Sequence, residues 1–214
     1  MTWALLSSSS ANDTPSAPGG LTLTVARFKW PLPDEAFFRR HFFDDEAVAL
    51  PYRVDRCRFI WEEFGPPADM LLVGGIPAMF ALDELRRSFI YGNFKATVML
   101  AQSFVEHSLG GMYALAGQDN IVAKGFKKLI DQACADGHVT QELATTLHEL
   151  RTMRNPYTHH TIGAGPRTYM ERLAQSGHYV PEEMVVEDAR VAIRAVVDYL
   201  RHGSPHWIPE KSDL

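Results

Sequence analysis

Apolar residues recur at steps of three and four from about residue 78 to residue 203, and this helical periodicity constrains the fold more than any other feature of the sequence. The clearest stripe consists of Phe94, Val98, Ala101, Val105, Leu109 and Met112. Because such a stripe has to be buried against other helices, the region predicts a bundle of four or five helices.

Glycine and asparagine interrupt the periodicity early in this region. One stripe covers residues 80–89, the next begins at Phe94, and Gly92 stands between them. A lone glycine costs a helix only about 1 kcal/mol. Two helices separated at Gly92 and one long helix through it are therefore both compatible with the sequence.

Capping residues mark the later helices. A helix over residues 121–135 is expected to end before Gly137, and Thr140 is a suitable N-cap for the helix that follows. The last helix is expected to open at Pro181, with two glutamates in its first turn, and to stop at Gly203. A further short helical stretch is expected over residues 168–174.

The chain before the bundle has a different character. Residues 7–20 hold only small, polar and turn-forming residues, which predicts a flexible tail. Residues 21–28 alternate as a half-buried strand does, whereas residues 53–61 fit a strand and a helix about equally. The predicted organisation is a tail over 1–20, a small mixed extension with at least one strand over 21–66, the helical bundle over 67–203 and a C-terminal tail over 204–214.

Composition limits the function. Apolar residues make up 46% of the 214 residues, enough for a full core, and the net charge is −5. A protein that holds duplex DNA by bulk electrostatics is normally basic, so duplex DNA is not an expected partner. The two cysteines, Cys57 and Cys134, are too few for a disulfide framework or a four-cysteine zinc site. The remaining histidines show no metal-ligand spacing, so neither a metal nor a cofactor is expected.

The sequence also predicts a soluble, cytoplasmic protein. The longest apolar stretch, Met70–Leu82, has thirteen residues and is interrupted by glycine and proline. A membrane-spanning helix needs about 20 apolar residues. The first residues carry no basic group before the apolar stretch, as a secretory signal would.

One short segment carries reactive residues. Arg154 and His159 lie on either side of Pro156, which disfavours helical geometry at Asn155. We therefore expect one helix to end at Asn155 and a new turn to begin at Pro156, with free N–H groups that suit a phosphate. Arginine binds phosphate oxygens as a planar fork, and histidine exchanges a proton near neutral pH. These two groups match the needs of metal-free RNA cleavage, which uses the 2′-hydroxyl that DNA lacks.

The segment Arg154-Asn155-Pro156-Tyr157-Thr158-His159 resembles the signature of HEPN domains, an arginine followed four to six residues later by a histidine, often with asparagine after the arginine. The helical patterns around it also resemble the family, over about residues 80–203. About twenty residues separate the motif from the last helix, more than in many members. The adjacent His160 also fits the spacing and is an alternative to His159.

The resemblance implies a helical homodimer in which two motifs meet, and a metal-independent endoribonuclease of a toxin–antitoxin or phage-defence type. Arg154 would bind the scissile phosphate of RNA and His159 would act as acid–base. A protein partner, either an antitoxin or a defence-system component, is a further implication. The alternative is a non-catalytic module of the same fold that binds a nucleotide, RNA or a protein.

Several neighbours have an auxiliary role in this prediction, each with a structural alternative. Asn155 would hold the turn or cap a helix, and Tyr157 would stack on a base or pack against the bundle. Arg151, one turn before the motif, would offer a second cation or remain a solvated helix residue. Glu106 would pair with the motif arginine inside the bundle or be an exposed carboxylate.

Overall fold

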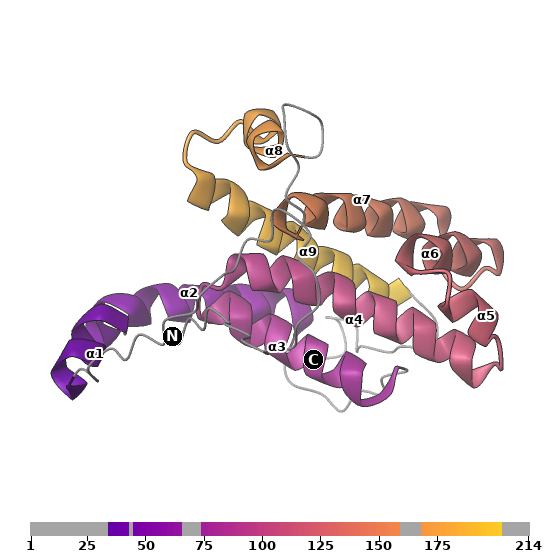
Figure 1. Cartoon of the computed structure of the whole chain (residues 1–214), viewed down its shortest axis with the longest axis horizontal. Helices are drawn as coiled ribbons and strands as arrows, with labels where there is room; N and C mark the ends of the chain where they lie inside the picture. The colour runs from indigo at the N-terminus through magenta and orange to yellow at the C-terminus, as the bar shows by residue number, and fades with distance from the viewer. Residues whose placement is uncertain (1–33, 43–44, 66–73, 159–167, 203–214) are drawn as a thin grey trace, which may run out of the picture. The chain divides into compact units, whose positions relative to one another are not determined.

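The computed structural model describes residues 34–42, 45–65, 74–158 and 168–202. These residues form nine helices and no strand (Figure 1). The all-α class predicted for the bundle is therefore confirmed in the described part of the chain. The strand predicted at residues 21–28 lies outside the described residues, as do the tails over 1–20 and 204–214.

By their internal contacts the residues divide into two units, Met1–Glu46 and Ala47–Leu214. The described helix of the first unit is α1 (Glu35–Phe42), whose first turn is capped where Asp34 Oδ1 accepts the backbone N–H of Phe37 at 2.8 Å. The division falls inside the extension that was predicted over residues 21–66.

Residues 53–61, which fitted a strand and a helix about equally, are helical and belong to α2 (Glu46–Phe64). Several contacts join it to the next helix, α3 (Gly75–Ile90), among them Arg86 over the ring of Phe64 at 4.3 Å. The rings of Phe59 and Phe89 lie 5.1 Å apart, and Arg56 donates a hydrogen bond to the carbonyl of Ile90 at 3.1 Å. Phe64, at the end of α2, is buried in the core of the second unit.

Gly92 separates two helices, α3 and α4 (Phe94–Leu115). Its φ of +83° belongs to the left-handed region that glycine adopts without steric cost. The backbone N–H of Gly92 bonds the carbonyl of Phe89 at 3.1 Å, and that of Asn93 bonds Ser88 at 2.7 Å. These bonds satisfy the carbonyls at the end of α3, which a helix terminus otherwise leaves unpaired.

The helix predicted over residues 121–135 is two helices, α5 (Asp119–Val122) and α6 (Phe126–Ala135). Gly125, with a φ of +79°, makes the break. The periodic apolar pattern continues across this glycine, because both helices face the same core, and the pattern alone therefore did not reveal the separation.

The N-cap predicted at Thr140, the short helix predicted over residues 168–174 and the helix start predicted at Pro181 are confirmed. Thr140 Oγ1 accepts the N–H of Leu143 at 3.1 Å, at the start of α7 (Gln141–Thr158). Thr168 caps the short helix α8 (Tyr169–Ser176), and α9 (Pro181–His202) opens at Pro181. From residue 75 onward the described chain thus holds seven helices, two more than the upper limit predicted, because α5 and α8 are short separate elements.

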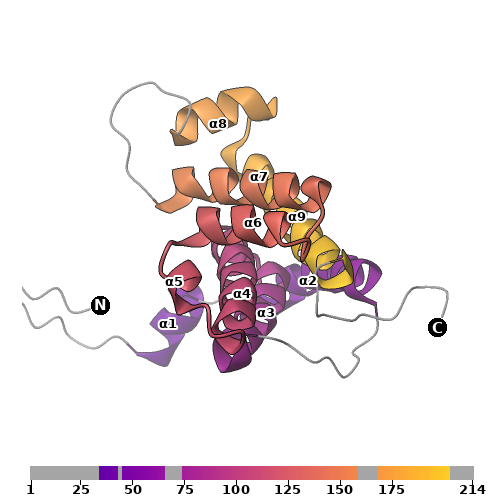
Figure 2. The same ribbon diagram turned by 90° about the vertical axis from the view of Figure 1, so that its right-hand side faces the viewer.

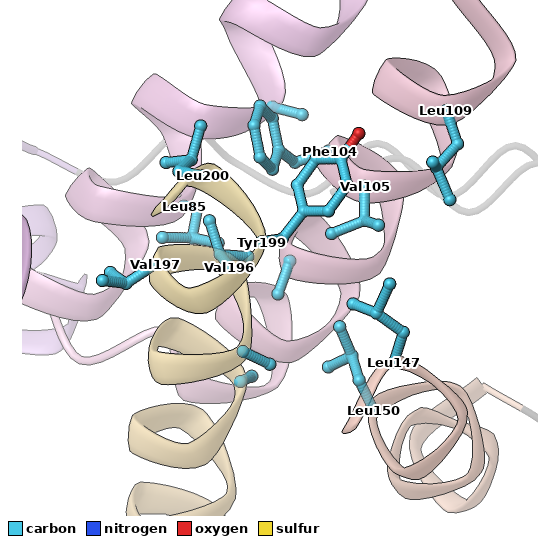
Figure 3. Packing of buried hydrophobic residues seen from close by; sticks show 14 of the residues in the cluster. Leu85, Phe104, Val105, Leu109, Leu147, Leu150, Val196, Val197, Tyr199 and Leu200 are labelled. Carbon is cyan, nitrogen blue, oxygen red and sulfur yellow. The ribbon is translucent and has the colours of Figure 1, made fainter. Parts of the chain in front are cut away.

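Helix α4 is the centre of the second unit and packs against α3, α6, α7 and α9. Figure 2 shows the same arrangement from the side, with α8 at the edge of the unit next to α7 and α9. In the core, Phe104 meets Tyr199 of α9 edge to face at 6.1 Å, while Leu147 and Leu150 of α7 approach from another side (Figure 3).

None of the described helices combines the length and the apolar character that crossing a membrane requires.

Two adjacent glycines on α4 allow a direct test of this packing. A Cβ at Gly111 would lie 2.4 Å from Cα of Gly74, whereas a Cβ at Gly110 would meet Val122 at an ordinary 3.6 Å. We expect Gly111→Ala to lower the free energy of unfolding by about 1–3 kcal/mol. We expect Gly110→Ala to raise it by up to about 1 kcal/mol, because alanine is the better helix former. Urea unfolding of the two variants measures the contrast, and equal effects would contradict the close approach.

Candidate functional site

The helix that carries the motif does not end where the sequence predicted. Pro156 lies inside α7, which continues to Thr158, so the expected end at Asn155 is wrong. Proline has no backbone N–H to donate to the carbonyl four residues earlier, and only two residues of α7 follow Pro156. The Thr158 hydroxyl lies within hydrogen-bond distance of the carbonyls of Arg154 and Asn155, at 3.4 and 3.3 Å. No new helical turn begins at Pro156, so the phosphate-binding helix terminus expected there is not formed.

Arg154 is half-buried in the last turns of α7. Its Nη1 donates a hydrogen bond to the Thr158 hydroxyl at 3.1 Å. This bond holds the guanidinium along the C-terminal end of the helix, from which the chain continues to His159. His159 and the alternative His160 lie outside the described residues, so the choice between them stays a prediction.

Arg154 lines a cleft of about 580 Å³ together with residues of α3 and α4. The other polar side chains on its wall are Glu84, Ser88, Gln102, Ser103 and Glu106. The apolar part of the wall consists of Ala96, Met99 and Leu100. A volume of this size is typical of small-molecule sites. The structure therefore brings into one cleft Glu106 and Arg154, which the sequence had suggested as a pair.

Glu106 is half-buried and accepts a hydrogen bond from Gln102 Nε2 at 3.3 Å. The residue is thus intermediate between the two alternatives considered for it, a buried partner of the arginine and an exposed carboxylate. Gln102 is 6% exposed, and its Oε1 has no hydrogen-bond partner among the described residues. Sequence reasoning missed Gln102, although a glutamine four residues before Glu106 on an apolar helix was a visible signal.

The other auxiliary residues lie around the end of α7. Arg151 is half-buried and is not among the described residues that line the cleft; its Nε is buried without a hydrogen-bond partner in the described part. Asn155 is half-buried inside α7 and does not act as the cap of a new helix.

Tyr157 packs against the bundle, which was the structural alternative for it. Its hydroxyl donates to Asp188 Oδ2 at 2.6 Å, and its ring meets that of Tyr169 edge to face at 5.8 Å. Asp188 is 2% exposed on α9 and also accepts hydrogen bonds from Arg172 of α8 at both carboxylate oxygens. One buried carboxylate thereby joins α7, α8 and α9. Sequence reasoning did not identify this ion pair, because the spacing between Arg172 and Asp188 follows no helical rule.

Burial and the hydrogen bond to Asp188 raise the pKa of the Tyr157 phenol above its usual value. The hydrogen bond to Asp188 also raises the pKa of Arg172, so the guanidinium stays charged. Both effects favour a neutral Tyr157 phenol and a charged Arg172 guanidinium at physiological pH.

In the part of the chain that the structure describes, no three His, Cys, Asp or Glu side chains gather as a metal site. Comparison of the chain with protein-family models, curated proteins and solved structures gives no match. The resemblance to HEPN domains therefore rests on the motif and on the helices around it.

The raised pKa of the Tyr157 phenol predicts that the folded protein loses stability in alkali. The phenol of the unfolded chain ionises near pH 10, the ordinary tyrosine value, whereas the folded phenol ionises only at higher pH. The contribution of Tyr157 to the free energy of unfolding is therefore complete below about pH 10 and is lost as the pH rises further. We expect Tyr157→Phe to cost about 1–3 kcal/mol at pH 7, because buried Asp188 loses a donor.

The gap in unfolding free energy between the wild type and Tyr157→Phe should then shrink above pH 10, as urea titrations at increasing pH would measure. Tyr179, which is 98% exposed, supplies the matched control, and Tyr179→Phe should change little at any pH. A gap that stays constant up to pH 11 would contradict the raised pKa.

Proposed function

We propose that this protein is a metal-independent endoribonuclease of HEPN type, with a four- to five-helix core bundle of that family. The observation that carries the proposal is the position of Arg154, half-buried at the end of α7 on the wall of a cleft of about 580 Å³ and five residues before His159. In this proposal Arg154 binds the phosphate, and His159, five residues further along the sequence, exchanges the protons.

The reaction needs two proton transfers and one stabilised charge. The 2′-hydroxyl oxygen attacks the adjacent phosphorus and gives its proton to a base, while the bond from phosphorus to the 5′-oxygen breaks and that oxygen receives a proton from an acid. The products are a 2′,3′-cyclic phosphate and a 5′-hydroxyl. In this proposal His159 acts as acid–base, with His160 as the alternative, and Arg154 stabilises the charge on the phosphate oxygens.

A homodimer supplies what one motif lacks. A single histidine serves poorly as base and acid in the same step, and a second copy with its motif nearby provides the other group. We propose a cytoplasmic homodimer that acts on RNA, with an antitoxin or defence-system protein as a further partner. Pairing two copies also gathers two Arg154 side chains near the substrate of a chain whose net charge is −5.

A non-catalytic binding module is the second candidate. The observation that favours it is the cleft itself, in which Arg154, Gln102 and Glu106 already present a cation, an amide and a carboxylate. These groups suffice to hold a nucleotide or an RNA end without any proton transfer.

RNA cleavage in EDTA tests the proposal. We expect the wild type to release fragments that end in 2′,3′-cyclic phosphate, and we expect His159→Ala and Arg154→Ala to lower the rate at least about 100-fold, the range that a general acid–base group contributes. Gel separation with end-group analysis of the products measures both the rate and the chemistry.

His107→Ala is the matched control, because His107 is exposed on α4, and it should cleave at the wild-type rate. Equal activity of wild type and His159→Ala would exclude that histidine, and the same assay on His160→Ala would then decide for the alternative. Absence of cleavage by the wild type over a broad RNA panel would favour the binding module.

A further inference from the structure

Two side chains of α4, Glu106 and Gln102, bring hydrogen-bond acceptors to the cleft beside Arg154. Glu106 offers carboxylate oxygens from the wall formed by α4, and Gln102 holds this carboxylate in place through its Nε2, 3.3 Å away. A half-buried carboxylate that is oriented in this way is suited to accept hydrogen bonds from a ligand.

Gln102 adds a second acceptor that lacks a donor. The side chain is 6% exposed, and its Oε1 has no hydrogen-bond partner among the described residues. A buried polar atom without a partner is costly, so such an atom in a native protein needs an explanation. The bond from Nε2 to Glu106 also fixes which way the amide is turned, because the reversed amide would place its oxygen against the carboxylate. Because this oxygen is buried from solvent, the acceptor that a ligand can reach in the cleft is the Glu106 carboxylate, which the Gln102 amide orients.

The apolar wall of the same cleft suits a flat ring. Ala96, Met99 and Leu100 line it, and Met99 is 45% exposed. Methionine sulfur makes favourable contacts with aromatic rings, and its flexible side chain adapts to their shape. Proteins that read the sequence of single-stranded RNA do so mainly through its unstacked bases, whose edges form hydrogen bonds with the protein.

Guanine is the RNA base whose Watson–Crick edge fits this arrangement. It carries two adjacent donors, N1–H and the N2 amino group, which a carboxylate accepts as a parallel pair. Adenine and cytosine each place a ring acceptor next to their amino group, and uracil has one N–H between two carbonyl oxygens. These three bases would each direct an acceptor at the carboxylate.

We propose that the cleft is a nucleobase pocket selective for guanine, in which Glu106 accepts the N1–H and N2–H donors and Met99 and Leu100 cover the ring. Gln102 is a positioning residue that orients Glu106. Arg154 lines the same cleft from α7, so in this proposal the phosphate of a bound guanosine lies toward the guanidinium. This inference rests on the proposed function in that RNA is the ligand, and it adds a specificity: cleavage next to guanosine.

Binding of the four nucleoside 3′-monophosphates to the full chain in EDTA tests the pocket. We expect isothermal titration to give guanosine 3′-monophosphate an affinity at least about tenfold higher than that of the adenosine, cytidine or uridine compounds, the discrimination of a good bidentate base contact. Equal affinities for all four would overturn the proposal.

Two variants with the same charge change separate recognition from general electrostatics. Glu106→Gln presents an amide N–H to the guanine amino group, so the preference for guanosine should fall to about onefold. Glu149 is an exposed glutamate on α7, and Glu149→Gln should retain the full preference. A guanine preference that survives in Glu106→Gln would overturn the role of this carboxylate.

Mapping of the cut sites in RNA by the wild type needs no variant, and it decides the question if Glu106→Gln does not fold. Cuts concentrated next to guanosine would support the pocket, whereas cuts without base preference would overturn it and leave the ribonuclease proposal standing. Selective binding of guanosine 3′-monophosphate without any RNA cleavage would give the opposite result, with the pocket supported and the ribonuclease overturned.

Discussion

The burial of α4 on several sides is the constraint on which the rest of the second unit depends. A helix that packs against α3, α6, α7 and α9 at once has little surface for polar residues. Most of its buried positions are apolar, and the buried polar residues are Thr97, Gln102 and Ser108. Thr97 satisfies its hydroxyl within the helix by bonding the carbonyl of Asn93 at 3.1 Å. Gln102 and the half-buried Glu106 line the cleft that also contains Arg154.

Asp188 is the second point on which the site depends. A carboxylate that is 2% exposed has to be paired, and here Tyr157 and Arg172 supply the donors from α7 and α8. Tyr157 lies three residues after Arg154, so this buried network anchors the segment of α7 that carries the motif. Removing one partner from such a network leaves an uncompensated charge, which costs more than the bond itself. The position of Arg154 is thus maintained by residues that do not line the cleft.

Local signals in the sequence predicted where α7 and α9 begin. Thr140 accepts the backbone N–H of Leu143, and Pro181 has the fixed φ that suits the first residue of a helix. The same reasoning failed at Pro156, where packing of the preceding helix and the Thr158 hydroxyl outweigh the local preference of proline. For the site, the sequence identified Arg154 and Glu106 as members of one region. It could not identify Arg172 with Asp188, because their contact arises from the packing of α8 on α9 and not from any spacing.

The acidic charge of the chain agrees better with recognition of a base than with recognition of a backbone. A protein that gains affinity by neutralising many phosphates needs a basic surface, and its binding weakens steeply with salt. A chain of net charge −5 with Glu84 and Glu106 on the wall of its cleft has no excess of positive charge for this purpose. Under the proposed function, affinity therefore has to come from hydrogen bonds and ring contacts to one nucleotide, with Arg154 for its phosphate. Such a site favours RNA segments whose bases are already unstacked, because the cleft offers little electrostatic energy to open a duplex.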